Sequence, residues 1–154
     1  MTSLPVGPQW QYEPKWDGFR SVAFRDNKRI DLQSKSGKPL TRYFPELVAA
    51  LSRLRAFKFV LDGEIVIPVD GDLSFDQLLV RIHPSASRVE KLSRESPGVF
   101  IIFDLLVNAE GESLIEFTLE KRRKELNRFA SKYLKNDQTL RLSPFTLEIP
   151  ALAS

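Results

Sequence analysis

A chain of 154 residues is long enough for one domain with a sizeable core, and 42% hydrophobic with 28% charged residues is typical of a globular protein. The absence of cysteine excludes disulfides, thiolate metal sites and cysteine nucleophiles, and the single histidine, His83, excludes a histidine-rich metal site. A net charge of +3 is compatible with nucleic-acid binding. No apolar run approaches the roughly 20 residues that span a bilayer, so we expect a cytoplasmic protein without a membrane partner.

The first third of the chain is expected to form antiparallel β structure. Residues 10–15 are a short run containing aromatic side chains, and Asp17 with Gly18 gives a tight-hairpin signal. Residues 19–25 and Arg29–Ser34 alternate between apolar and polar side chains, with a turn over residues 26–28. Two consecutive hairpins therefore predict an antiparallel sheet.

The middle of the chain predicts helices and one apolar strand region. Proline is tolerated in a first helical turn, so Pro45 is expected to open a helix. The buried stripe of this helix is expected to contain Phe44, Leu47, Val48, Leu51 and Leu54. Residues 57–69 are rich in valine, isoleucine and phenylalanine, and predict either one strand or a hairpin around Asp62 and Gly63.

Two short helices are expected to follow. Ser74 is a suitable N-cap for a helix within residues 73–82. The side chains expected to point inward from this helix are Phe75, Leu78, Leu79 and Ile82. A second helix is expected after Pro84, ending near Arg94.

The last third predicts a buried strand, the longest helix and a final strand. Residues 99–107 are apolar apart from Asp104, which indicates a strand covered on both faces, and residues 108–112 form a turn. A helix is expected over residues 116–134, and a last strand over residues 139–142. The core candidates of the helix are Leu119, Leu126, Phe129 and Ala130. Its cationic cluster, formed by Lys121, Arg122, Arg123 and Lys124, is expected to be solvated. The element order predicts an α+β fold in which antiparallel β-sheets are flanked by helices.

Lys15 is the strongest candidate nucleophile in the chain. Trp16 and Phe19 would surround it with apolar surface, and Arg20 would add a second cation, so desolvation and like charge would both lower its pKa. A neutral lysine amine is a nucleophile. The alternative from spacing alone is a surface lysine beside an ordinary Asp-Gly hairpin.

Two carboxylates and one aromatic ring in apolar strands are further candidates. Burying a carboxylate is costly unless something binds it, so Glu64 and Asp104 are either ligand contacts or outward-facing residues. Phe103 could stack on a base or belong to the core, and His83 could be a base or a structural residue at a helix end. The basic turn over residues 34–38 could meet phosphates, although it is not a P-loop.

Four motifs in order resemble the covalent nucleotidyltransferases, and among them the ATP-dependent DNA ligases. The run Lys15-Trp16-Asp17-Gly18-Phe19-Arg20 matches the KxDGxR motif of that superfamily at every fixed position. Ser34-Lys35-Ser36-Gly37 is similar to its Ser-Arg-x-Gly motif, with Lys35 replacing the arginine. The runs of residues 61–65 and 103–106 are similar to the third motif and to the aromatic motif after it.

The resemblance implies an ATP-grasp-like nucleotidyltransferase fold and a role for each matching residue. Lys15 would attack the α-phosphate of ATP to form lysyl-AMP, and AMP would then pass to the 5′-phosphate of nicked double-stranded DNA for sealing in DNA repair or recombination. Magnesium would neutralise phosphate charge, with no metal ligand assigned in this chain. The residues implied to bind nucleotide are Glu13 at the base edge, Trp16, Arg20 at the sugar or phosphate, Lys35, Glu64 at the ribose and Phe103 at adenine.

The sequence also departs from the family pattern. Two downstream motifs, a Glu-Gly-Ile/Val-Val-x-Lys segment and a final pair of lysines, do not occur, and residues 148–150 do not resemble the first of them. We therefore expect residues 1–154 to be a single partial adenylation domain, truncated and without an OB-fold domain. We also expect it to be weak alone and completed by a second chain or a C-terminal segment.

Two other functions fit the same residues. One is a different covalent nucleotidyltransferase, such as an RNA ligase or a GTP-using capping enzyme, because aromatic stacking accepts either purine. The other is a module that binds nucleotide or DNA without turnover. Labelling with ATP, and competition by GTP, would distinguish the three.

Overall fold

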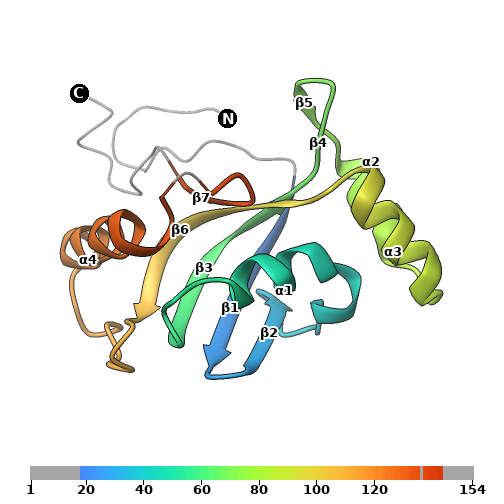
Figure 1. Ribbon diagram of the computed structural model, residues 1–154. Coiled ribbons are helices and arrows are strands. Elements are labelled where there is room, and N and C mark those ends of the chain that lie inside the picture. The colour runs from blue at the N-terminus through green and yellow to red at the C-terminus, as the bar shows by residue number, and fades with distance from the viewer. Residues whose placement is uncertain (1–17, 136, 144–154) are drawn as a thin grey trace.

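A five-stranded mixed sheet forms the centre of the computed structural model, which describes residues 18–135 and 137–143 (Figure 1). The strands are β1 (Phe19–Asp26), β2 (Arg29–Ser34), β3 (Lys58–Val66), β6 (Val99–Val107) and β7 (Leu140–Leu142). They lie in the order β2-β1-β3-β6-β7, and all neighbours are antiparallel except β6 and β7, which are parallel. The α+β class is therefore confirmed.

The first hairpin follows the alternating pattern of the sequence. β1 and β2 pair antiparallel around Asn27, which has a φ of 57° in the left-handed region that asparagine tolerates. Ser21, Ala23 and Arg25 are buried on one face of β1, as alternation predicts. The expected strand over residues 10–15 lies outside the described residues.

β3 runs through Asp62 and Gly63 without turning, so the hairpin alternative at these residues is wrong and the single strand is right. A Cβ atom on Gly63 would lie 2.2 Å from the backbone oxygen of Ile101 on β6. Glycine at this position therefore permits a close approach between two strands and does not make a turn.

The tight hairpin lies a few residues further along the chain. β4 (Pro68–Val69) and β5 (Asp72–Leu73) pair antiparallel, with Asp70 and Gly71 between them at φ values of 52° and 88°. Two consecutive residues with positive φ form the primed turn that Asp-Gly favours. This hairpin projects from the end of the sheet (Figure 1).

We expect Gly63→Ala to destabilise the fold by about 1–3 kcal/mol, because the added methyl group has no room against the β6 backbone. Urea unfolding followed by circular dichroism measures this loss. Gly98→Ala is the comparison variant and should cost less, because its Cβ would first meet a side-chain atom, Glu46 Oε2 at 3.3 Å, in a tight contact and not a clash with backbone. Equal losses in the two variants would contradict the steric explanation.

One face of the sheet carries the main core. The helices α1 (Pro45–Ser52), which begins at the expected proline, and α4 (Leu119–Tyr133) both contribute to it. A short 3₁₀ helix, η1 (Thr41–Tyr43), precedes α1. Residues of this core include Phe44, Leu47, Leu51, Leu54, Phe59, Leu61, Ile65, Phe100, Ile102, Leu126 and Phe129. The stripe predicted for α1 is confirmed, except that Val48 is only partly buried.

The helices α2 (Phe75–Arg81) and α3 (Ala86–Glu95) lie at the other end of the sheet from α4 (Figure 1). Ser74 caps α2 by accepting a hydrogen bond from the Gln77 amide, as expected. The predicted inward face of α2 is right for Leu78, which is buried, and wrong for its other three members, which are substantially exposed. These exposed members are Phe75 at 41%, Leu79 at 51% and Ile82 at 41%. Arg81 is fully buried in their place.

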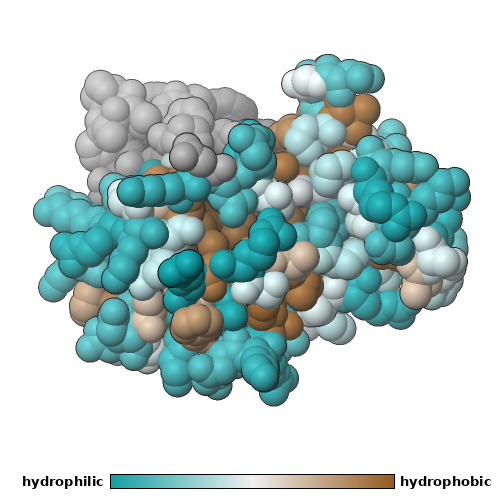
Figure 2. Space-filling view, viewed as in Figure 1, coloured by the Kyte–Doolittle hydropathy of each residue, from teal (hydrophilic) through white to brown (hydrophobic). Residues whose placement is uncertain are grey.

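α4 starts at Leu119, three residues later than expected, because Thr118 caps it by accepting a hydrogen bond from the Lys121 amide. Leu126 and Phe129 are buried as expected, and Leu119 and Ala130 are only partly buried. Hydrophilic side chains cover α4 and most of α3 in Figure 2, with hydrophobic ones in the centre of the view and at the base of the β4–β5 hairpin.

Candidate functional site

The sheet face opposite the main core carries a polar cluster near the start of β1. Gly18 lies against this part of β3, since a Cβ atom on it would be 2.3 Å from the Ile65 backbone oxygen and 2.9 Å from the Glu64 Cγ atom. The residue that ends the Lys15-Trp16-Asp17-Gly18 run is therefore packed beside the third motif. Any side chain at Gly18 would push the first motif away from β3.

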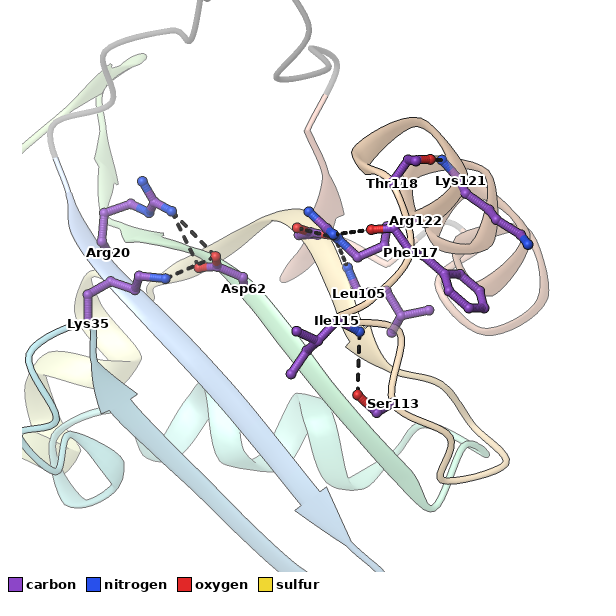
Figure 3. A network of polar contacts seen from close by, with 11 residues as sticks. Arg20, Lys35, Asp62, Leu105, Ser113, Ile115, Phe117, Thr118, Lys121 and Arg122 are labelled. Carbon is purple, nitrogen blue, oxygen red and sulfur yellow. Dashed lines mark hydrogen bonds and ion pairs between the residues drawn. The ribbon is translucent and has the colours of Figure 1, made fainter.

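Asp62 lies at the centre of this cluster (Figure 3). Its carboxylate accepts a hydrogen bond from Lys35 Nζ at 3.2 Å, and Arg20 Nη2 lies 3.5 Å from both of its oxygens. Only 12% of the Asp62 side chain is exposed, against 37% for Arg20 and 48% for Lys35. One buried carboxylate thus holds two cations that have unused hydrogen-bond donors.

Glu64 lies on the same face of β3, two residues further along. It is directly opposite Arg20 in the β1–β3 register, and paired residues project from the same face of a sheet. Glu64 is 7% exposed, so the alternative of an outward-facing residue on a half-exposed strand is wrong. A buried carboxylate beside an arginine is suited to accept hydrogen bonds from a ligand hydroxyl.

Phe103 reaches the same face because β6 contains a bulge. The register pairs Asp62 with Asp104 and Gly63 with Ile102, so Phe103 is an extra residue in β6. Its ring is 3% exposed, packs with Val66, Val99 and Ile101, and lies 5.2 Å below the Arg20 guanidinium.

Asp104 pairs with a residue of α4. Arg122 Nε donates to both carboxylate oxygens of Asp104, at 3.0 and 3.1 Å. The neighbouring Arg123 donates to the Ser143 backbone oxygen at 2.7 Å, and burial lowers its pKa while the Asp104 charge opposes that shift. Two members of the cluster predicted to be solvated, Arg122 and Arg123, therefore lie against the sheet, and that prediction is wrong for them.

An open cavity of about 780 Å³ adjoins the cluster. Arg20 and Lys35 line it together with the turn that follows β2 and the apolar side chains of Phe75 and Ile82. Gly37 in that turn has a φ of 93°, and Ser34 Oγ accepts a hydrogen bond from the Lys38 amide at 3.0 Å. The lining of the cavity therefore combines cationic and apolar side chains.

The structure brings together four of the seven residues that the sequence assigns to nucleotide chemistry, namely Arg20, Lys35, Glu64 and Phe103. The other three, Glu13, Lys15 and Trp16, lie outside the described residues. His83 is more simply structural, because its Nδ1 atom accepts a hydrogen bond from the Ser85 amide at 3.0 Å. Sequence reasoning did not single out Asp62 or Arg122, although a charged Asp62 in so apolar a strand was a usable signal.

Comparison with known proteins decides the family. A family model described as the ATP-dependent DNA ligase domain matches residues 5–143. This chain belongs to the ATP-dependent DNA ligase family. The chain is 52% identical over 101 residues to DNA ligase C2 of Mycolicibacterium smegmatis, covering 66% of this chain and 28% of that protein. It is 40% identical over 149 residues to DNA ligase C of Mycobacterium tuberculosis, covering 97% and 41%.

Solved ligase structures share the fold. The chain superposes on mycobacterial DNA ligase D complexed with ATP and MES with a TM-score of 0.61 at 28% identity, covering 87% of this chain and 39% of that one. The ligase domain of M. tuberculosis LigD gives a TM-score of 0.60 at the same identity and coverage. This ligase chain therefore spans less than half the length of these relatives. Within residues 18–135 and 137–143, no helix has the length and apolar content that crossing a membrane requires.

Proposed function

We propose that this chain carries out the adenylation step of a DNA ligase, with Lys15 as the nucleophile. The neutral Lys15 amine attacks the α-phosphorus of ATP, a P–N bond forms, the bond to the bridging oxygen breaks, and pyrophosphate leaves while the amine loses a proton. The observation that carries the proposal is the convergence of Arg20, Lys35, Glu64 and Phe103 beside Gly18, three residues after Lys15, in a chain of this family.

The described residues would bind and orient the nucleotide. Arg20 and Lys35 have free donors for the sugar and phosphates, and Asp62 holds both in place before ATP arrives. Glu64 would accept from a ribose hydroxyl, and Phe103 would stack on adenine. The Arg20 guanidinium carbon lies 5.2 Å from the centre of the Phe103 ring, so one face of this ring already takes a cationic group that adenine could replace. On nucleotide binding, adenine would replace the Arg20 guanidinium on the face of the Phe103 ring, and Arg20 would turn toward the sugar or phosphate.

For Glu13 and Trp16 the proposal rests on the family motifs alone. Glu13 would read the edge of the base and Trp16 would cover the lysine with apolar surface. We propose that residues 1–154 form one partial adenylation domain, because five of the seven described strands form one sheet that carries the main core.

We assign strand joining to the whole ligase, because this chain spans 41% of DNA ligase C. AMP would pass from Lys15 to the 5′-phosphate of a nick, and the 3′-hydroxyl would displace it to join the strand. The proposed setting is the repair and recombination of DNA, processes that leave nicked double-stranded DNA, and the proposed location is the cytoplasm. A relative 32% identical over 123 residues is a multifunctional non-homologous end joining protein, LigD, of Mycobacterium bovis.

Magnesium would enter with the phosphates of ATP and supply charge neutralisation. Within the described part of the chain, no three acidic or histidine side chains gather to hold a metal ion. Asp62 and Asp104 are already occupied by cations of the protein. The described residues therefore do not fit a resident metal, and we assign no step to one.

Incubation of the purified chain with α-labelled ATP and magnesium, followed by a denaturing gel, tests the proposal. We expect label to remain on the chain and unlabelled ATP to compete better than GTP. Stronger competition by GTP would favour a capping-type enzyme. No label at any nucleotide concentration would sink self-adenylation and favour a binding module.

Glu64 makes a separate prediction about the sugar. If Glu64 accepts a hydrogen bond from a ribose hydroxyl, ATP should support half-maximal labelling at about 10- to 100-fold lower concentration than 2′- or 3′-deoxy-ATP. In Glu64→Ala we expect this ratio to fall close to one. Glu110→Ala removes an exposed carboxylate and should keep the wild-type ratio. The same ratio in all three proteins would exclude Glu64 from the ribose contact.

A further inference from the structure

Phe103 and Asp104 are consecutive residues that project from the same face of the sheet. Ordinary alternation would send one of them into the main core, as it does Phe100 and Ile102. The bulge at Phe103 breaks the alternation: Phe103 joins the cluster of the opposite face, Asp104 pairs with Asp62, and Leu105 returns to the core. The direction of the Phe103 ring thus depends on how this bulge is held.

Arg122 lies outside the sheet, beside Phe117 (Figure 3). Its Nε atom donates to both oxygens of Asp104, and its Nη1 atom donates to the Phe117 backbone oxygen at 2.7 Å. Asp104 also accepts from the Leu105 amide at 2.9 Å. The pair is well shielded, with 18% of the Arg122 side chain and 9% of the Asp104 side chain exposed. A shielded and hydrogen-bonded ion pair fixes geometry better than an exposed one.

The Arg122–Asp104 pair also affects the charges around Asp62. Asp62 and Asp104 are directly opposite in the β3–β6 register, so their carboxylates repel each other unless each has its own cations. Asp62 has Arg20 and Lys35, while Asp104 has Arg122 in direct contact and the charge of Arg123 nearby. Loss of Arg122 would leave the Asp104 charge to compete for the cations of Asp62, and Arg20 lies on the Phe103 ring.

We propose that Arg122 is a positioning residue of the nucleotide site, acting through Asp104 to orient Phe103 for stacking on a purine. It does not touch the nucleotide. The inference rests on the proposed function, because it requires that Phe103 stack on the base. It assigns a role to a cation that sequence alone places in a solvated cluster.

Proton NMR of a bound nucleotide reads stacking directly. The probe is α,β-methylene-ATP, whose bridging carbon blocks loss of pyrophosphate, added to the full chain. We expect the adenine H2 and H8 signals to move upfield on binding to wild type, through the ring current of Phe103. In Arg122→Ala the upfield shift should shrink and the dissociation constant should rise by roughly 10- to 100-fold. Phe103→Leu should lose the shift altogether.

Controls separate positioning from general stability. Lys124→Ala removes an exposed cation from the same helix and should match wild type. Asp104→Asn keeps the shape and loses the charge that holds Arg122, so it should also weaken the shift, but by less than Arg122→Ala, because no carboxylate is left to compete for Arg20. Arg122→Lys keeps the charge but cannot make both sets of hydrogen bonds, and should be intermediate. Circular dichroism establishes whether each variant is folded. If Arg122→Ala is not folded, Arg122→Lys and Asp104→Asn provide the test instead.

The outcomes distinguish the inference from the function on which it rests. If wild type neither binds the probe nor shifts its signals, the proposed function fails. If wild type does both, and the folded Arg122 and Asp104 variants keep its shift and dissociation constant, the function stands and Arg122 has no positioning role.

Discussion

Replacing Arg81 with methionine is expected to cost about 3–5 kcal/mol of folding free energy, because it leaves the Glu46 carboxylate shielded without its cation. Arg81 is fully buried, and its Nη1 atom donates to Glu46 at 2.7 and 2.9 Å and to the Tyr43 backbone oxygen at 3.1 Å. Its Nη2 atom donates to the Ser96 backbone oxygen at 2.7 Å. One guanidinium therefore ties α2 to α1 and to the end of α3.

The size of the expected loss is large for a chain of this length. Domains have total stabilities of about 5–15 kcal/mol, so the variant would lose a large fraction of its own. The melting temperature should fall by roughly 10 °C, which thermal unfolding followed by circular dichroism would measure. The Gly98 amide would still donate to Glu46, at 2.7 Å, but a single neutral donor does not replace an arginine.

Two further variants test the explanation. Arg94→Ala breaks an exposed helical pair with Glu90, whose side chains are 67% and 54% exposed, and should cost under about 0.5 kcal/mol. Arg81→Met with Glu46→Leu removes both charges and should be more stable than Arg81→Met alone, because no buried charge is left uncompensated. If the double variant is no better, packing around Arg81 matters more than its charge.

Asp-Gly pairs show what local sequence could and could not predict. The pair at Asp62 and Gly63 lies inside a strand, while the same two residue types at Asp70 and Gly71 make a hairpin with positive φ at both positions. The difference comes from the neighbouring strand, since β6 packs so closely on Gly63 that only glycine fits. That constraint comes from residues about forty positions away, and local turn propensity contains no information about it.

The buried face of α2 illustrates the same limit for helices. Apolar spacing favours Leu78 together with Phe75, Leu79 and Ile82 as the buried side. Of these four the helix buries only Leu78, and it buries Arg81 as well. Burial of an arginine requires a distant carboxylate, and Glu46 lies 35 positions earlier. By contrast, α1 and the β1–β2 hairpin follow their patterns closely, because their partners are near in sequence and mainly apolar.

For the site, the order of the motifs predicted the convergence of Arg20, Lys35, Glu64 and Phe103, which the structure brings to one face of the sheet. It did not predict that Asp62 would hold two of these side chains. It also did not predict the bulge that turns Phe103 and Asp104 to one face, because a bulge depends on the register of two strands.

Lys15→Arg is expected to abolish labelling by α-labelled ATP. Arginine keeps the positive charge, but its guanidinium stays protonated at every usable pH and has no free electron pair for phosphorus. Lys38→Arg is the matched control, because Lys38 is an exposed lysine of the adjoining cavity that the proposal does not use as a nucleophile.

The chemistry of the label identifies the attacking group independently of the variants. A phosphoramidate of lysine is cleaved by acid and survives alkali, whereas an ester of serine, threonine or tyrosine resists mild acid. We therefore expect acid to release AMP from the labelled wild-type chain. Acid-stable label, or label retained in Lys15→Arg, would show that another residue accepts the nucleotide. Label lost in Lys15→Arg and kept in Lys38→Arg requires a neutral amine at position 15, because charge is the same in all three proteins.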